Sequence, residues 1–511
     1  MLSTILNLKS MNLTEFHRPK PLTLPGGNFM KTLNFMQRIF IITLLSSCTI
    51  LFANFEQEGK VPITSPSKTA IDYFLQGRDL QERLQAQESI QYFEKAISED
   101  PTFAMSYLYL SLVTPTNKGF FENIEKAKNH LNNVSEGEKL WILGFDAGVN
   151  GFTMKQREAY TKLATLYPQD ERVLNLLGTH YFAQQDYEKA IEYYTKATEI
   201  NPSFSQPYNQ LGYAHRFMGN YKEAEKAFKK YIELIPNDPN PYDSYAELLM
   251  KMGRYSESIE SYKKALTFNP NFVASYIGIA TNLNYLGKHQ EARAQLEKLY
   301  KIARNDGERR AAHFAMTVSY SDEGNFEQAL KELEKQYQIA QKNNDAAAIA
   351  GDFIAMGNIY IEMGEYEHAL ERFEKAIKVV TNSNLTQEVK DNFQRGYLYN
   401  TTRAFVKKND LEKAKTNAQE HRKQVKLIEN PFQMRLSHEL YGMIALAKKE
   451  YDGAIEELQQ SNLQDPYNLY RLALAYEGKK DKANAKEYYK RAKEYNALNN
   501  LNYAFVRNMF K

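Results

Sequence analysis

Apolar residues recur along most of this chain at the three- and four-residue spacing of amphipathic helices. The clearest example is the segment DYEKAIEYYTKATEINP (186–202), which returns as NYKEAEKAFKKYIELIP (220–236) and as RYSESIESYKKALTFNP (254–270). The copies follow one another at a constant interval, and each has an aromatic residue at its second and ninth positions, a small residue at its fifth and a final proline. The pattern predicts a helix that buries one face and ends before the proline, where the helical conformation is disfavoured.

A second amphipathic helix precedes each copy, and both helices carry small residues where a larger side chain would hold the two apart. The residues that show this best in one unit are Leu177, Gly178, Tyr181, Tyr187, Ala190, Tyr194, Ala197 and Pro202. In type and spacing they resemble the tetratricopeptide repeat (TPR), a helix–turn–helix unit of about 34 residues. The resemblance implies an all-α fold, a right-handed superhelical solenoid of antiparallel helix pairs.

The repeat extends over most of the sequence. Units that mostly keep this regular length cover 70–304, and units with a longer spacing cover 305–495. The longer spacing is similar to that of the TPR variant with a longer second helix. We expect about twelve repeats, preceded by a linker at 54–69. We also expect residues 496–511 to form a C-terminal capping segment, because such an array must cover its last apolar face.

The first 53 residues read as a leader. Lys31 and Arg38 precede the mostly apolar run 39–52, which is short for a membrane span of about 20 residues and suits the core of a signal peptide. We expect the natural start to be Met30, and we expect an exported protein that is periplasmic or anchored at the cell envelope.

Three ways of ending the leader remain open. The stretch LSSC (45–48) resembles the bacterial lipobox, which would make Cys48 a lipidation site and attach the N-terminus to a membrane. The apolar residues that follow Cys48 instead favour ordinary cleavage after Ala53. The third alternative is an uncleaved N-terminal anchor.

Charge and motifs exclude several classes of function. The chain has 65 basic and 62 acidic residues, but residues 1–53 contribute five basic and one acidic, so the remainder has a net charge of −1. This balance gives no electrostatic reason to expect a nucleic-acid partner. Cys48 is the single cysteine, so no internal disulfide forms. The sequence contains no P-loop, dinucleotide fingerprint, nucleophile elbow, kinase signature or metal-ligand spacing, and we expect no enzymatic activity, no cofactor and no metal.

The resemblance to TPR proteins also implies a binding site, because their first helices line a concave groove. Amide side chains there can bind both the N–H and the C=O groups of an extended peptide, and aromatic or arginine side chains can act as anchors. The candidate peptide-binding residues are Asn175, Thr179, Asn209, Gln210, Tyr213, Arg216, Phe217, Asp243, Glu247, Asn284 and Tyr285. The lysine and asparagine with which chaperone-type TPRs hold a terminal carboxylate are absent from the matching positions, which disfavours a co-chaperone role.

These observations favour a non-enzymatic interaction scaffold that binds a peptide or protein segment in its concave groove on the cell-envelope side. An alternative is a regulatory subunit that acts in trans on a signalling kinase or cyclase. Residues 135–178 are similar to TPR tails that follow such catalytic domains in bacteria, whereas this chain carries no catalytic domain of either kind.

Overall fold

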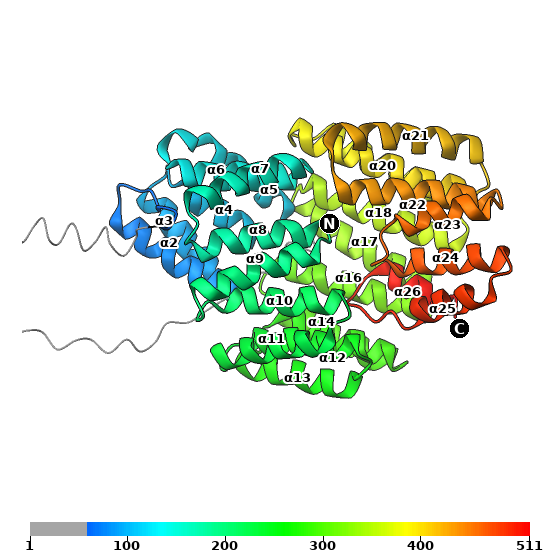
Figure 1. Cartoon of the computed structure of the whole chain (residues 1–511), viewed down its shortest axis with the longest axis horizontal. Helices are drawn as coiled ribbons and strands as arrows, with labels where there is room; N and C mark the ends of the chain where they lie inside the picture. Colours follow the sequence, from blue (N-terminus) through cyan, green and yellow to red (C-terminus); the bar gives the residue numbers. More distant parts are fainter. Residues whose placement is uncertain (1–58, 511) are drawn as a thin grey trace, which may run out of the picture.

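Paired helices make up nearly all of the part of the chain that the structure, a computed structural model, describes, which is residues 59–510 (Figure 1). The first helices of the pairs are α2 (Lys68–Gln81), α4 (Ala104–Val113), α6 (Glu136–Val149), α8 (Glu171–Ala183), α10 (Ser205–Phe217), α12 (Pro239–Lys251), α14 (Val273–Tyr285), α16 (Asp306–Glu323), α18 (Ala346–Met363), α20 (Gln387–Lys407), α22 (Pro431–Ala447) and α24 (Pro466–Gly478).

The second helices follow at once in the chain. They are α3 (Ala86–Glu99), α5 (Asn117–Asn129), α7 (Thr153–Leu166), α9 (Tyr187–Ile200), α11 (Tyr221–Leu234), α13 (Tyr255–Phe268), α15 (His289–Ile302), α17 (Phe326–Lys342), α19 (Tyr366–Thr381), α21 (Leu411–Ile428), α23 (Tyr451–Gln459) and α25 (Lys482–Lys493). A short 3-10 helix, η3 (Leu131–Asn133), follows α5, and α26 (Leu501–Asn508) ends the described chain. The all-α solenoid and the expectation of about twelve repeats are confirmed. The leader, including Met30, Cys48 and Ala53, lies outside the described residues.

In six of the pairs a glycine of the first helix closely approaches a large residue of the second. A Cβ atom built on Gly77 would lie 2.8 Å from the Phe93 ring, and Gly178 meets the fully buried Tyr194 in the same way. The same contact joins Gly144 to Tyr160, Gly212 to Phe228, Gly357 to Phe373 and Gly442 to Leu458. The separation along the chain is the same in all six of these pairs. The glycine removes the side chain that would otherwise keep the two helices apart.

The helices from α16 to α22 are longer than those before them, and not only the second helices of the pairs. First helices lengthen from 13 residues in α8 to 18 in α18 and 21 in α20. Second helices lengthen from 14 residues in α9 to 16 in α19 and 18 in α21. The expectation of a longer second helix alone is therefore incomplete. The tight turn within the pair stays short, with one residue in the left-handed region, such as Gly253 (φ +76°) or Asn409 (φ +63°).

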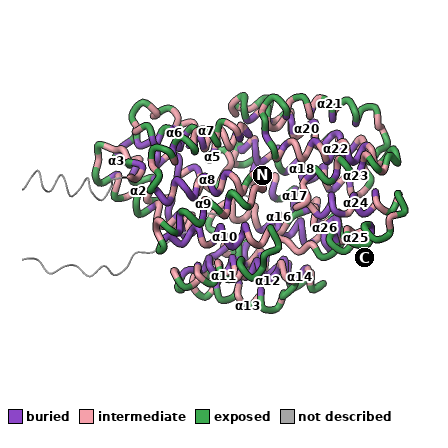
Figure 2. Tube along the Cα trace, in the orientation of Figure 1, coloured by how far each residue is buried: buried purple, intermediate pink, exposed green. Residues whose placement is uncertain are grey.

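The solenoid curves until distant repeats touch. The Lys118 backbone N–H donates to Asp345 Oδ2 (3.1 Å), and Asn430 Nδ2 donates to the Gly151 carbonyl (2.8 Å). Arg435 Nη1 donates to the Gln184 carbonyl (2.9 Å). Repeats near the two ends of the chain thus lie side by side, and the first helices face an enclosed interior. Figure 2 shows the exposed residues gathered on outer helices such as α13, α21 and α25.

The two ends of the described chain also pack along this array. Before α2, the backbone N–H groups of Val61 and Thr64 donate to carboxylates at the starts of α8 and α6 (Asp170 and Glu138, both 2.8 Å). At the other end, α26 turns back and packs against α16 and α24. The segment expected to be only a cap therefore also contacts repeats near the middle of the chain. None of the helices within 59–510 has the length and apolar character needed to cross a membrane.

The close approach inside each pair gives a first prediction. Replacing Gly178 by leucine should lower the free energy of unfolding by about 3 kcal/mol, because the Tyr194 ring leaves no room for the side chain. Gly453→Leu is the matched control, since a Cβ atom at Gly453 in α23 meets nothing within 4 Å. It should not destabilise the fold and should stabilise it by up to about 1 kcal/mol, because leucine has a higher helix propensity than glycine. Urea unfolding followed by circular dichroism measures both. Equal destabilisation by the two substitutions would contradict the importance of the contact.

A buried histidine gives a second prediction, on pH. His421 in α21 is 1% exposed. Burial and, to a smaller extent, the charges of Arg395 and Arg422 lower its pKa to about 4. Between pH 6.5 and 4 the unfolded chain binds a proton here that the folded chain does not, so stability falls as the pH falls through this window. From pH 7 to 5 the wild type should lose about 2 kcal/mol more than His421→Leu.

Urea unfolding at the two pH values tests this difference. His368→Leu, at an exposed histidine in α19, is the control and should keep the pH dependence of the wild type. If His421→Leu kept it too, His421 would not be the group responsible.

Candidate functional site

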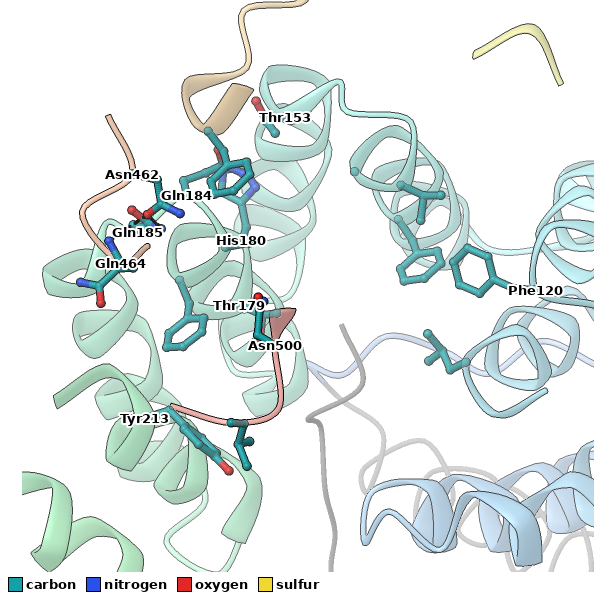
Figure 3. Close-up of a pocket in the computed structure, with 18 of the residues that line it drawn as sticks. Phe120, Thr153, Thr179, His180, Gln184, Gln185, Tyr213, Asn462, Gln464 and Asn500 are labelled. Atoms are coloured by element: carbon teal, nitrogen blue, oxygen red, sulfur yellow. Dashed lines mark hydrogen bonds between the residues drawn. The ribbon is translucent and has the colours of Figure 1, made fainter. Parts of the chain in front are cut away.

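A cavity of about 1070 Å³ lies inside the curved array. Residues of α4, α5, α6, α8 and α10 line it on one side, and residues of α16, α18 and α20 line it on the other. Two loops complete the wall, one before α24 and one between α25 and α26. Figure 3 shows side chains from several of these parts around the cavity, among them Phe120, Thr179, His180, Tyr213, Gln464 and Asn500.

The α8 and α10 part of the wall contains most of the candidate residues. Those that line the cavity are Asn175, Thr179, Gln210, Tyr213, Arg216 and Phe217. Phe217 stacks on Tyr187, with ring centres 5.4 Å apart, and contacts Phe182 edge-on. Of the candidate residues on these two helices, only Asn209 does not line the cavity.

Three other candidates do not reach the cavity. Asn209, Asp243 and Glu247 are at most 3% exposed and lie between neighbouring first helices. Tyr213 Oη donates to Glu247 Oε1 (2.9 Å), and Arg216 pairs with the other oxygen of Glu247 (3.0 Å). The structure therefore gives Glu247 a different role from the expected one: it joins two repeats instead of meeting a ligand. Ser275 Oγ donates to Asp243 Oδ1 (2.7 Å) and joins the next two repeats in the same way.

The last two candidates are covered by the chain itself. Asn284 and Tyr285 line a small cleft together with residues 497–507. The Tyr285 hydroxyl donates to the Ala497 carbonyl (2.7 Å) and accepts from the Ala497 N–H (2.8 Å). Burial raises the pKa of Tyr285, so its hydroxyl stays protonated and can serve as both donor and acceptor.

Sequence reasoning missed the aromatic end of the cavity. Tyr109, Phe120, Trp141 and Phe145, from α4, α5 and α6, line the cavity there. The ring centres of Phe120 and Phe145 are 6.3 Å apart. These helices belong to units in which the repeat pattern is weak. The adjacent pair Phe120–Phe121 was the available signal, because two neighbouring residues on a helix cannot both face the same core.

The opposite wall was missed as well. Arg310 of α16 forms a two-pronged ion pair with Asp352 of α18 (2.7 and 2.9 Å). Gln336 Nε2 donates to the same carboxylate (2.6 Å). Lys251, at the end of α12, lies over the Tyr495 ring at 3.5 Å, and burial lowers the pKa of Lys251 to about 7. Most charges near the cavity are thus paired or shielded, and amides and aromatic rings make up much of its surface.

This lining is suited to holding a ligand by hydrogen bonds and ring contacts. Within residues 59–510, no three histidine, cysteine, aspartate or glutamate side chains are grouped so that they could hold a metal ion. The wall offers amide side chains from several helices, which can donate to carbonyl groups and accept from N–H groups.

Solved structures to which this chain is similar include the following three. The Cut9–Hcn1 hetero-tetramer of the APC/C is 14% identical, covers 83% of this chain and 76% of its own, and has a TM-score of 0.39. A tetratricopeptide repeat protein from Parabacteroides merdae is 16% identical over 65% of this chain and 100% of its own, with a TM-score of 0.32. YrrB, a TPR protein with an unusual peptide-binding site, is 22% identical over 36% of this chain and 93% of its own, with a TM-score of 0.25. A search of curated proteins returns no match to the chain.

Family models of the tetratricopeptide repeat match five segments: residues 171–204, 205–238, 240–272, 353–379 and 466–497. Each matched segment includes parts of the first and the second helix of one pair. The first segment lies in α8 and α9, and the last lies in α24 and α25. These five segments are therefore tetratricopeptide repeats, and the chain is a tetratricopeptide repeat protein.

Proposed function

We propose that this chain is a non-enzymatic scaffold that binds an extended peptide or protein segment in the cavity between its first helices. The observation that carries the proposal is a set of buried amide oxygens on the cavity wall. Asn175 Oδ1, Gln184 Oε1 and Gln336 Oε1 have no hydrogen-bond donor among the described residues, and all three side chains line the cavity. Leaving such an acceptor unpaired costs about 1–3 kcal/mol, so a rotation of these side chains that turns the oxygens toward the N–H groups of a ligand backbone would be favourable.

The shape of the cavity supports an extended ligand. A folded domain of 100 residues has a radius of gyration of about 13 Å, which is too large for a space of 1070 Å³. A single stretch of backbone fits between facing walls and can use acceptors on both, because Asn175 lies on α8 and Gln336 on α17. Phe217 and Phe182 on the same wall offer ring surface for one or two side chains of the ligand.

The proposal includes the cell-envelope side as the place of action. Its support is the leader, in which two basic residues precede an apolar run of signal-peptide length. Membrane attachment through the N-terminus would follow if Cys48 is lipidated or if the leader is retained. The partner would then be an envelope protein with an accessible extended segment.

Filling the cavity should abolish binding. Gly351 of α18 lines the cavity and has nothing within 4 Å of a Cβ atom, so Gly351→Trp should fold normally and place an indole in the ligand's path. We expect an affinity pull-down from envelope extract to retain a partner on the wild type and at least about ten-fold less of it on Gly351→Trp, which corresponds to a loss of about 1.4 kcal/mol.

Gly453→Trp is the matched control. This glycine is also helical and also has free space around it, but it lies in α23, away from the residues that line the cavity. The control should retain the partner at the wild-type level. Equal retention on both variants would move the site out of the cavity, and no retained envelope protein on any of the three would contradict the proposed function.

Export has its own test. The chain starting at Met30 should be found in the envelope fraction, whereas removal of residues 30–53 should leave it in the cytoplasm. A fatty-acid label that is lost in Cys48→Ala would identify a lipoprotein. A mature N-terminus at Asn54 would instead identify cleavage after Ala53, and an intact leader would identify an anchor. Retention of the whole chain in the cytoplasm would contradict the envelope location.

A further inference from the structure

The segment that follows α25 lies in the groove of its own chain. Residues 495–500 (YNALNN) leave α25, cross the ends of α12 and α14, and lead into α26. All six line the cavity or the small cleft beside it. Except for the exposed Asn500, these residues are half-buried. We call residues 495–500 the strap.

The groove recognises the backbone of the strap. The Tyr285 hydroxyl binds both the N–H and the C=O group of Ala497 (2.8 and 2.7 Å). These two hydrogen bonds recognise backbone groups and do not depend on the alanine side chain. Tyr285 is one of the residues that the repeat pattern assigned to ligand binding, so a first-helix position of this TPR array already holds a peptide backbone.

Two side chains of the strap are recognised next to it. Asn496 Oδ1 accepts from the Tyr255 hydroxyl (2.8 Å), and the Tyr255 ring stacks on Tyr285. The Tyr495 ring lies under the Lys251 ammonium, and the Tyr495 hydroxyl donates to Gln464 Oε1 (2.5 Å). Asparagine and tyrosine are thus bound through specific groups, while no strap residue carries a charge.

The two arginines next to the strap are already paired with carboxylates. Arg507 of α26 pairs with Asp322 of α16 (2.7 Å) and covers the Tyr285 ring at 4.4 Å. Arg216 pairs with Glu247. A charged ligand segment would find no free partner in these pairs, whereas an uncharged segment needs none. The strap, which carries no charge, matches this environment.

The strap differs from α26 in how it is held. Leu501, Phe505 and Val506 of α26 are buried in an apolar cluster with residues of α16 and α18. No strap side chain is fully buried. Tyr495 packs at the edge of this cluster and stacks on Tyr503 of α26, and the rest of the strap is held by hydrogen bonds and ring contacts, each of which contributes little net stability in competition with water. The strap can therefore be released while α26 stays in place.

We infer that the face formed by Lys251, Tyr255 and Tyr285 is a peptide-binding site for an uncharged, extended segment with tyrosine and asparagine side chains, and that the strap is its resident ligand. This inference rests on the proposed function, and it gives that function a ligand class. A partner segment of the same chemistry binds by replacing the strap. The strap competes at a high effective concentration, on the order of millimolar for a short tether, so a partner must bind more tightly than the isolated strap does.

The test uses the full chain and a labelled synthetic peptide, EYNALNNL (residues 494–501), with fluorescence anisotropy as the readout. The double variant Tyr495→Ala/Asn496→Ala weakens the strap and leaves the groove unchanged; at α26 it removes only the stacking of Tyr495 on Tyr503. The peptide should bind this variant at least about ten-fold more tightly than it binds the wild type, because the internal competitor is weaker. Adding Tyr285→Phe should reverse the gain by about ten-fold, because the bonds to the ligand backbone are lost.

A second peptide provides the matched control. In EYNPLNNL, the residue that corresponds to Ala497 is proline, which has no N–H to donate to the Tyr285 hydroxyl. It should bind the double variant at least about ten-fold more weakly than EYNALNNL does. Binding that is insensitive to both Tyr285→Phe and the proline, or no binding to the double variant at millimolar peptide, would overturn the inference.

Hydrogen exchange on the folded chain gives an independent readout. In Tyr285→Phe, the amides of residues 495–500 should exchange at least about ten-fold faster than in the wild type, whereas those of α26 should be unchanged. Exchange that rises equally in α26, or in neither segment, would show that the strap is not a separable ligand. The exchange measurement tests whether the strap is a separable ligand even if the double variant does not fold. None of these measurements uses an envelope extract, so they can succeed or fail independently of the pull-down.

Discussion

The structure depends on one steric constraint, the close crossing of two helices in every repeat. A small residue on the first helix faces a residue at a fixed separation along the second, as with Gly178 and Tyr194. Where the small residue is not glycine, the separation is still kept: Ser111, Ala246, Ala280, Thr317, Thr402 and Ala473 precede Ala127, Tyr262, Leu296, Leu333, Ala418 and Tyr489. Because interiors are close-packed, this crossing fixes the geometry of each pair, and stacked pairs then fix the curvature of the whole array.

The same constraint determines where the longer repeats can grow. In α8 the small residue comes about two helical turns after the helix start at Glu171, whereas in α16, α18 and α22 the small residues Thr317, Gly357 and Gly442 come about three turns after it. The added turn therefore lies at the end away from the tight turn. These added ends make the contacts that close the solenoid. Asn305, before α16, donates to Gln87 (2.6 Å), Asp345, before α18, accepts from Lys118, and Asn430, before α22, donates to Gly151.

Local patterns predicted the repeats because each repeat is specified by its own residues. The crossing, the tight turn and the concave positions of α8 and α10 all follow from spacings within a single repeat. The closure of the array does not follow from such spacings, because contacts such as that of Arg435 with Gln184 join residues that are 251 positions apart in the sequence. The position of such a contact results from the small rotations between many successive repeats. Neither of the two side chains has a feature from which the contact could be predicted. The contacts of Glu247 could not be predicted for a related reason. Its position in the repeat was assigned correctly, but its hydrogen bond from Tyr213 depends on the residue that the neighbouring repeat places opposite it.

The way in which the solenoid closes also bears on how a ligand reaches the cavity. Within a pair, large side chains such as Tyr194, Tyr231 and Phe373 are fully buried, and opening a pair would expose them at a cost of about 1.5–3 kcal/mol each. The contacts across the closure, by contrast, are mostly single hydrogen bonds between polar groups, such as those of Lys118 and Arg435, each worth about 0.5–1.5 kcal/mol net. The array should therefore open between its distant repeats before any pair comes apart. A solenoid of this kind can admit an extended segment, close around it and keep every helix pair intact.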